Sequence, residues 1–171
     1  MNVSAISDHI VSWLTQYAKQ ARAKGFVVGV SGGIDSATTS TLCALTGLEV
    51  TLLNLPIHQA NDQLNRGLNH MNWLSNTFTN IHMHTVPLDA ALEAFKAAQV
   101  VEGSDPELTQ LALANSRARL RMATLYYTAQ CRSALVAGTG NKVEDFGVGF
   151  YTKYGDGGVD LSPIADLTKT E

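Results

Sequence analysis

The stretch VVGVSGGIDSATTS, residues 27–40, restricts the possible folds more than any other part of the sequence. The apolar run FVVGVS, which begins at residue 26, is typical of a strand that is buried on both faces of a sheet. Gly32 and Gly33 then allow the backbone to turn tightly and to expose its N–H groups. A helix after such a turn points its positive end at the loop, where it favours an anion. The stretch therefore predicts a strand, a tight loop and a helix, and leaves open whether the loop is a plain turn or a cradle for phosphates.

Helical and strand patterns alternate along the rest of the chain. The spacing of apolar residues predicts helices at residues 6–21, 35–45, 61–76, 88–99 and 104–132 (the last as one long helix or a broken pair), and strands at residues 26–31, 50–56, 80–87 and 134–140. From residue 141 onward we expect loops with short helical turns. The alternation predicts an α/β fold, a doubly wound parallel sheet with helices on both faces. Ligands of such sheets bind beyond the carboxyl ends of the strands, where both SGGIDS and GTGN fall.

Composition excludes several classes of protein. The chain has 171 residues, of which 45% are hydrophobic and 16% charged, which fits one globular domain over residues 1–171. A net charge of −3 counts against a broad basic surface for nucleic acid. The sequence has neither a signal-peptide pattern nor an apolar run that could cross a membrane, so we expect a cytoplasmic protein. Cys43 and Cys131 lack metal-site spacing, and we expect both to be buried free thiols.

Asp35 is the unusual residue of the glycine-rich loop. A carboxylate repels a neighbouring phosphate unless a cation such as Mg²⁺ lies between them. The loop matches neither the P-loop pattern nor the dinucleotide fingerprint. Composition alone leaves two interpretations open: Asp35 is a metal ligand beside a phosphate site, or it is only the N-cap of the following helix.

The loop SGGIDS resembles the pyrophosphate loop of the ATP pyrophosphatases, which adenylate a substrate and release pyrophosphate. Three later motifs are similar, in the same order, to NAD synthetase: NSRARLRM at residues 115–122, GTGNKVED at residues 138–145 and GFYTKYGDGGVDLSP at residues 149–163. The resemblance covers roughly residues 27–169. It implies a Rossmann-like fold of the ATP pyrophosphatase type and the ATP-dependent amidation of deamido-NAD to NAD, the final step of NAD biosynthesis.

The resemblance also implies roles for individual residues. Asp35 and Glu144 would be the Mg²⁺ ligands, and Lys169 would reach the phosphates of ATP. The implied ATP-binding residues are Gly29, Val30, Ser31, Gly32, Gly33, Ile34, Asp35, Ser36, Thr139 and Lys169. The implied deamido-NAD-binding residues are Arg119, Lys153 and Asp160.

Plainer interpretations of some residues remain open. Glu144 and Lys169 could be ordinary surface residues, and Leu53 or Leu55 could either pack on the base of ATP or belong to the core. Arg117 and Arg121 share one side of a helix by their i,i+4 spacing, and a solvated helix face explains them.

The chain departs from the family pattern in two places. GTGN stands where ammonia-using members commonly have Gly-Thr-Asp-His, and it is closer to the glutamine-dependent branch. The sequence contains no glutaminase segment, so we expect ammonia as the direct nitrogen donor, with a separate glutaminase as one source of it. Family members continue beyond the position of Lys169, so we expect the C-terminal segment that closes over ATP to be missing.

The family also implies a homodimer, which the surplus apolar surface predicted for residues 105–132 would suit. Two other functions remain open. The chain could be a different ATP pyrophosphatase that acts on a nucleotide or a tRNA, or a nucleotide-binding module without activity.

Overall fold

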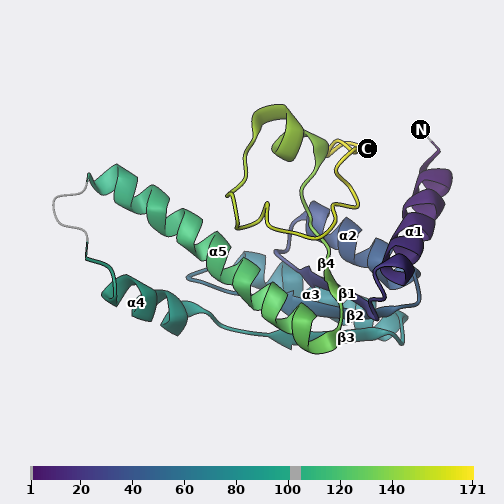
Figure 1. Cartoon of the computed structure of the whole chain (residues 1–171), viewed down its shortest axis with the longest axis horizontal. Coiled ribbons are helices and arrows are strands. Elements are labelled where there is room, and N and C mark those ends of the chain that lie inside the picture. Colours follow the sequence, from purple (N-terminus) through teal and green to yellow (C-terminus); the bar gives the residue numbers. More distant parts are fainter. Residues whose placement is uncertain (1, 101–104) are drawn as a thin grey trace.

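The computed structural model describes residues 2–100 and 105–171. The helices are α1 (Val3–Gln20), α2 (Ile34–Leu45), α3 (Asn61–Thr77), α4 (Asp89–Ala97) and α5 (Pro106–Arg132), the strands are β1 (Gly25–Gly29), β2 (Glu49–Asn54), β3 (Ile81–Thr85) and β4 (Leu135–Val136), and a π-helix, η1, spans Val143–Val148. The strands form one parallel sheet in the order β3-β2-β1-β4 (Figure 1). This arrangement confirms the predicted doubly wound α/β fold.

The central strand β1 supplies side chains to both faces of the sheet. Phe26 and Val28 pack with α1, α2 and α3 on one face, whereas Val27 packs with α4 and α5 on the other. These three side chains are fully buried. The alternation follows from the two-residue period of a strand, so the continuous apolar run is the expected pattern for a strand covered on both sides.

The chain reverses its winding direction at β1. The connections from β1 through β2 to β3 lead away on one side, and β4 then pairs with β1 on the other side. In open α/β sheets such a switch point leaves a crevice beyond the carboxyl ends of the two strands. The glycine-rich loop follows β1. The segment GTGN, residues 138–141, follows β4 after the single residue Ala137.

The structure decides between two predicted alternatives and changes one predicted boundary. The last predicted helix is one unbroken helix, α5, rather than a broken pair, and the side chain of its N-cap Asp105 accepts a hydrogen bond from the Glu107 N–H group. Residue 104, the first of that expected helix, lies outside the described residues. Strand β4 has only two residues instead of the seven expected, because Ala137 forms an isolated bridge with Leu161 and the chain then leaves the sheet.

The two cysteines lie in different environments. Cys43 belongs to α2 and is fully buried in the core, and burial raises the pKa of its thiol far above the ordinary value. Cys131 is an exposed free thiol in the last turn of α5, so the expectation that it is buried is wrong. Within the described residues, no helix combines the length and the apolar character needed to cross a membrane.

We predict that Phe26→Ala lowers the free energy of unfolding by about 3–5 kcal/mol, because it empties a fully buried position in the central strand. Urea denaturation followed by circular dichroism measures this change. Phe150→Ala is the control, since Phe150 is 80% exposed and its loss should cost less than about 0.5 kcal/mol. Equal losses for the two variants would contradict the assignment of Phe26 to the core.

Candidate functional site

The glycine-rich loop ends at an open helix N-terminus. Gly33 is the N-cap of α2 and has no side chain to cap it, so the first N–H groups of the helix have no side-chain cap. Asp35 is the second residue of the helix and therefore not its N-cap, which removes the plainer of its two interpretations. The geometry suits an anion at the start of α2.

Two serine hydroxyl groups fix the shape of the loop. The Ser31 N–H group donates to Oγ of Ser36 at 3.2 Å, and the Ser36 hydroxyl donates to the Gly33 carbonyl at 3.0 Å. The Gly33 N–H group in turn donates to Oγ of Ser31 at 3.3 Å. These bonds hold the backbone of the loop in one conformation before any ligand binds.

Gly32 is required for the loop to reach this shape. Its φ is +83°, a value that side chains disfavour, and a Cβ atom here would collide with the carbonyl oxygen of Gln63 in α3. The Arg66 side chain, one turn further along α3, donates from Nε to the Gly32 carbonyl at 3.4 Å. Helix α3 therefore supports the loop from one side by direct backbone contact.

Three residues far apart in the sequence form a charged cluster beside the loop. Nζ of Lys169 lies 3.3 Å from Oδ2 of Asp35 and 3.1 Å from Oε1 of Glu144. The hydrogen bonds to Glu144 and then Asp35 raise the pKa of Lys169, so this lysine remains charged at neutral pH. We name Asp35, Glu144 and Lys169 the charged cluster.

The two carboxylates of this cluster fit a magnesium ion. Both already lie within salt-bridge distance of one cation, the Lys169 ammonium group. Mg²⁺ typically takes one or two carboxylates from a protein and completes its shell with phosphate oxygens and water. No group of three acidic, histidine or cysteine side chains that could hold a metal exists in residues 2–100 and 105–171, so a cage made only of protein ligands is not available there.

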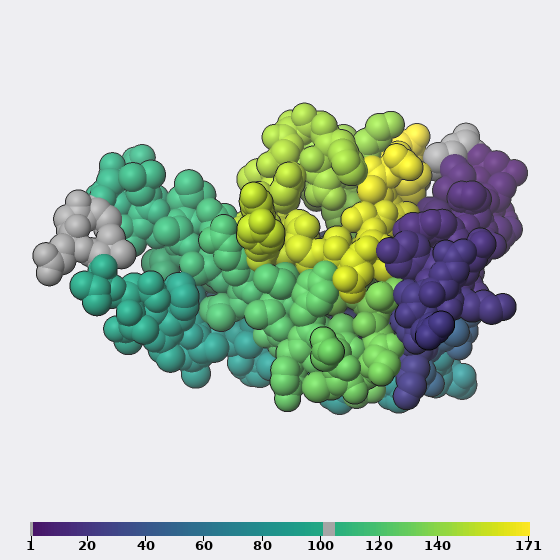
Figure 2. Space-filling view, viewed as in Figure 1, coloured from purple at the N-terminus to yellow at the C-terminus, as the bar shows by residue number. Residues whose placement is uncertain are grey.

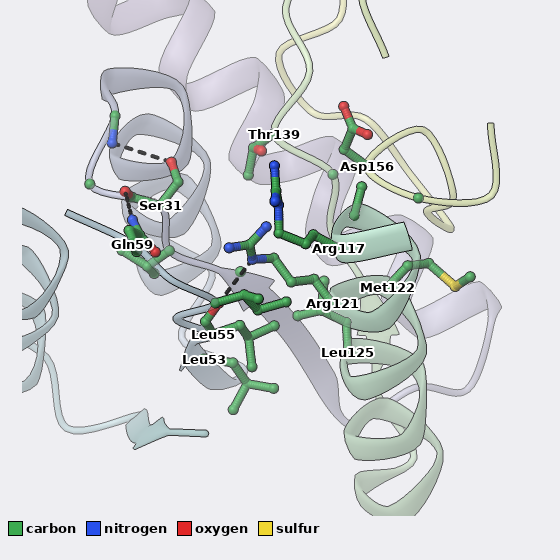
Figure 3. Close-up of a pocket in the computed structure, with 18 of the residues that line it drawn as sticks. Ser31, Leu53, Leu55, Gln59, Arg117, Arg121, Met122, Leu125, Thr139 and Asp156 are labelled. Carbon is green, nitrogen blue, oxygen red and sulfur yellow. Dashed lines mark hydrogen bonds between the residues drawn. The ribbon is translucent and has the colours of Figure 1, made fainter. Parts of the chain in front are cut away.

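A cavity of about 680 Å³ opens at the carboxyl ends of β1, β2 and β4. Its walls include the glycine-rich loop, the end of β2, one side of α5, and Gly155, Asp156, Gly158 and Val159 (Figure 3). Figure 2 shows an opening framed by the yellow-green and yellow residues that follow β4. The cavity lies where the switch point of the sheet predicts a ligand.

The predicted ATP-binding residues line two cavities, except for Asp35 and Lys169, which line neither. Thr139 lines the large cavity together with residues 29–33. Ile34 and Ser36 line a smaller cavity of about 240 Å³, which also contacts Arg66 and His70. Leu53 and Leu55 form part of the apolar wall of the large cavity, beside Ile57. Both leucines are also buried in the core, which confirms that interpretation of them, and a base that packs on this wall stays a prediction.

The arginines of α5 lie differently from the simplest expectation. Arg117 and Arg121 are half-buried and line the cavity, so their interpretation as a solvated helix face is wrong. The Arg121 side chain donates from Nε to the Leu55 carbonyl at 2.9 Å, and burial is the main cause that lowers its pKa. A signal was present in the sequence, because Arg117, Arg121 and Leu125 continue one stripe at i,i+4 spacing.

The three predicted deamido-NAD residues do not line this cavity. The exposed Arg119 donates from Nε to the Lys153 carbonyl at 3.2 Å, so these two residues do lie together. The Asp160 carboxylate accepts from the Tyr126 hydroxyl at 3.0 Å and from the Val136 N–H group at 2.8 Å. Burial, followed by the bond to Asp160, raises the pKa of Tyr126 to about 12. The substrate roles of Arg119, Lys153 and Asp160 therefore stay predictions.

Comparison with known proteins gives consistent matches. A family model described as NAD synthase matches residues 6–171. The NH(3)-dependent NAD(+) synthetase of Carboxydothermus hydrogenoformans is 41% identical over 169 residues, which cover 96% of this chain and 65% of that protein. The chain thus spans about two thirds of the length of this relative.

Two solved structures match the fold closely. The NMN synthetase of Francisella tularensis has a TM-score of 0.88 at 35% identity and covers 99% of this chain and 67% of its own. The NH3-dependent NAD synthetase of Campylobacter jejuni has a TM-score of 0.87 at 31% identity and covers 100% of this chain and 70% of its own.

We predict that Gly32→Ala weakens ATP binding by at least about tenfold, because the strained φ and the collision with Gln63 displace the loop. Isothermal titration calorimetry with ATP measures the effect. The matched control is Gly47→Ala, since Gly47 also has a positive φ, +73°, but a Cβ atom there meets nothing within 4 Å. Gly47→Ala should lower stability by about 1 kcal/mol and leave ATP affinity unchanged. Normal ATP affinity in the Gly32 variant would rule out the loop as the binding element.

Proposed function

The chain belongs to the NAD synthase family, and we propose that it amidates deamido-NAD to NAD in an ATP-dependent reaction that releases AMP and pyrophosphate. The observation that carries the proposal is the charged cluster, which joins Asp35, Glu144 and Lys169 beside an open helix N-terminus. This arrangement suits a reaction that must hold and release a highly charged pyrophosphate group.

The proposed chemistry has two steps. A carboxylate oxygen of deamido-NAD attacks the α-phosphorus of ATP, and the bond between that phosphorus and the pyrophosphate oxygen breaks. Ammonia then attacks the activated carbonyl carbon, the bond to the AMP oxygen breaks, and a proton is released with AMP. The first step converts a carboxylate, which resists amination, into a group with a good leaving group.

The residues of the chain position the reactants and neutralise charge. The N–H groups at the start of α2 bind the phosphates that depart as pyrophosphate. Lys169 adds positive charge beside the same helix turn. Asp35 and Glu144 would hold Mg²⁺, which supplies further charge against pyrophosphate when it is bound.

Ammonia is the proposed direct nitrogen donor. The relatives from Carboxydothermus hydrogenoformans and Campylobacter jejuni carry names that specify NH3 dependence, which supports this choice. A separate glutaminase remains a partner that could supply ammonia. We place the reaction in the cytoplasm, since both Cys43 and Cys131 are free thiols.

A mononucleotide is the second candidate substrate. One solved relative with 35% identity is named an NMN synthetase, which favours the deamido form of NMN as an alternative acceptor of the adenylyl group. Both candidate acceptors carry the same nicotinic acid carboxylate, so the chemistry at the α-phosphate is the same. The difference lies in whether a second nucleotide is bound.

One assay tests these proposals. The chain is incubated with ATP, Mg²⁺ and ammonium, with either deamido-NAD or the deamido form of NMN, and pyrophosphate and the amidated product are measured. Pyrophosphate release that depends on deamido-NAD supports the main proposal, and dependence on the mononucleotide supports the second. Release that depends only on another nucleotide or a tRNA would identify a different ATP pyrophosphatase. ATP binding with no turnover would identify a nucleotide-binding module.

We predict that Asp35→Asn and Glu144→Gln each lower turnover by at least about 100-fold, because each removes one of the two carboxylates offered to Mg²⁺. The midpoint of urea unfolding should change little, since neither residue belongs to the core. Glu49→Gln serves as the control, because Glu49, at the start of β2, pairs with His82 of β3 and lines neither cavity. Near-normal turnover of either purified site variant would refute the metal assignment.

We also propose a homodimer. Leu108 and Leu111, in the first half of α5, are 64% and 59% exposed, and Figure 1 shows this half of the helix extending away from the sheet. We predict that Leu108→Glu combined with Leu111→Glu halves the mass measured by light scattering, because buried charge would oppose association. A monomeric unsubstituted chain at high concentration would contradict the proposal.

A further inference from the structure

The charged side chains that line the large cavity are mainly basic, whereas the chain as a whole has a negative net charge. The whole chain has a net charge of −3, yet the cavity is lined by Arg66, Arg117 and Arg121 and by one carboxylate, Asp156. A partly enclosed cleft with charges of one sign concentrates the electric field and attracts ions of the opposite sign. The cavity as a whole therefore favours an anionic ligand.

Two of these arginines have no acidic partner. No carboxylate lies within salt-bridge distance of Arg117 or Arg121 in residues 2–100 and 105–171. Two acids that could balance this charge have other partners: Asp89, whose charge acts on Arg121, accepts from the His58 N–H group at 2.8 Å, and Asp156, which lines the cavity, accepts from the Thr152 N–H group at 2.9 Å.

The like charges of Arg117 and Arg121 also affect each other. Burial, and then the charge of Arg117, lowers the pKa of Arg121, while Asp89 partly opposes the shift. Two half-buried cations that repel each other destabilise the free protein, and a bound anion would remove that cost.

The position of the pair selects one part of a nucleotide. In Figure 3 both side chains reach from α5 into the cavity, Arg121 towards Leu55 and Arg117 towards Thr139. On one side of them is the apolar wall of Leu53 and Leu55, and on the other is the glycine-rich loop at Ser31. A nucleotide that packs its base on the wall and places its terminal phosphates at the loop has its α-phosphate between the wall and the loop, beside Arg117 and Arg121.

We propose that Arg117 and Arg121 bind the α-phosphate of ATP and keep AMP bound after pyrophosphate has left. The guanidinium groups offer planar pairs of N–H donors that match phosphate oxygens, and both groups carry positive charge to the phosphorus at which the bonds are exchanged. This assignment rests on the proposed function. It gives the two charged groups of the site different ligands: the charged cluster binds pyrophosphate, and Arg117 and Arg121, which we name the arginine pair, bind AMP.

Binding measurements without turnover test the assignment. The affinities of AMP, adenosine and inorganic pyrophosphate are measured by calorimetry for the unsubstituted chain and for Arg117→Gln. We expect AMP to bind about 10- to 100-fold more weakly to the variant, the range for a lost hydrogen bond to a charged group. Adenosine and pyrophosphate should bind within about twofold of the unsubstituted chain, because neither carries the α-phosphate. The ratio of AMP affinity to adenosine affinity should therefore be much smaller in Arg117→Gln than in the unsubstituted chain.

Arg121→Gln provides a second variant, and Arg132→Gln a control on the same helix. Arg121 also donates to the Leu55 carbonyl, so its loss can lower stability as well as affinity. The affinities of this variant are therefore corrected for the fraction of folded protein, which urea denaturation measures. Arg132 contacts His84 outside the cavity, and its loss should leave all three affinities unchanged.

Three results would overturn the inference. One is an equal loss of AMP and adenosine affinity in Arg117→Gln. Another is a loss of pyrophosphate affinity as large as that of AMP, and the third is an unsubstituted chain that does not prefer AMP to adenosine. The proposed function is judged separately, by the product formed in the turnover assay.

Discussion

The pairing of β1 with two neighbours is the interaction on which the rest of the structure depends. Backbone hydrogen bonds join β1 in parallel to β2 along five residue pairs and to β4 along two. Because all three strands run in the same direction, their carboxyl ends meet at one edge of the sheet. The glycine-rich loop, the apolar wall and Thr139 are the continuations of these three strands, and their proximity follows from the pairing alone.

Charge is distributed over this edge in two separate groups. The charged cluster gathers one residue each from α2, η1 and the last residues of the chain, with its cation between two carboxylates. The arginine pair on α5 has no such balance in the described residues. A substrate with phosphates at two distances from its base could satisfy both groups at once, which is the electrostatic pattern expected for a nucleoside triphosphate.

The sequence predicted the parts of this structure that depend on short-range patterns. The buried run at residues 26–31 and the two glycines after it are local signals, and they located both the sheet and the loop. The orientation of Arg117 and Arg121 was not local, since it depends on which side of α5 meets the end of β2. Residues 137–140 were predicted as strand because they continue the apolar run of residues 134–136, but in the described part of the chain no strand pairs with them beyond the Ala137–Leu161 bridge. The extent of the single domain, residues 1–171, and the substrate roles of Arg119, Lys153 and Asp160 stay predictions.

The Asp160 contacts have a consequence for how the sheet avoids self-association. An edge strand exposes unpaired N–H groups on which another chain can add a strand, the first event in many forms of aggregation. At the β4 edge the Asp160 carboxylate accepts a hydrogen bond from the Val136 N–H group. The backbone N–H group of Asp160 donates in return to the Val136 carbonyl at 3.0 Å. The opposite edge, β3, instead carries the exposed side chains of His82 and His84, which contact Glu49 and Arg132. The β4 edge is thus covered by the chain itself at Val136, which leaves no free backbone groups at this residue on which another strand could add.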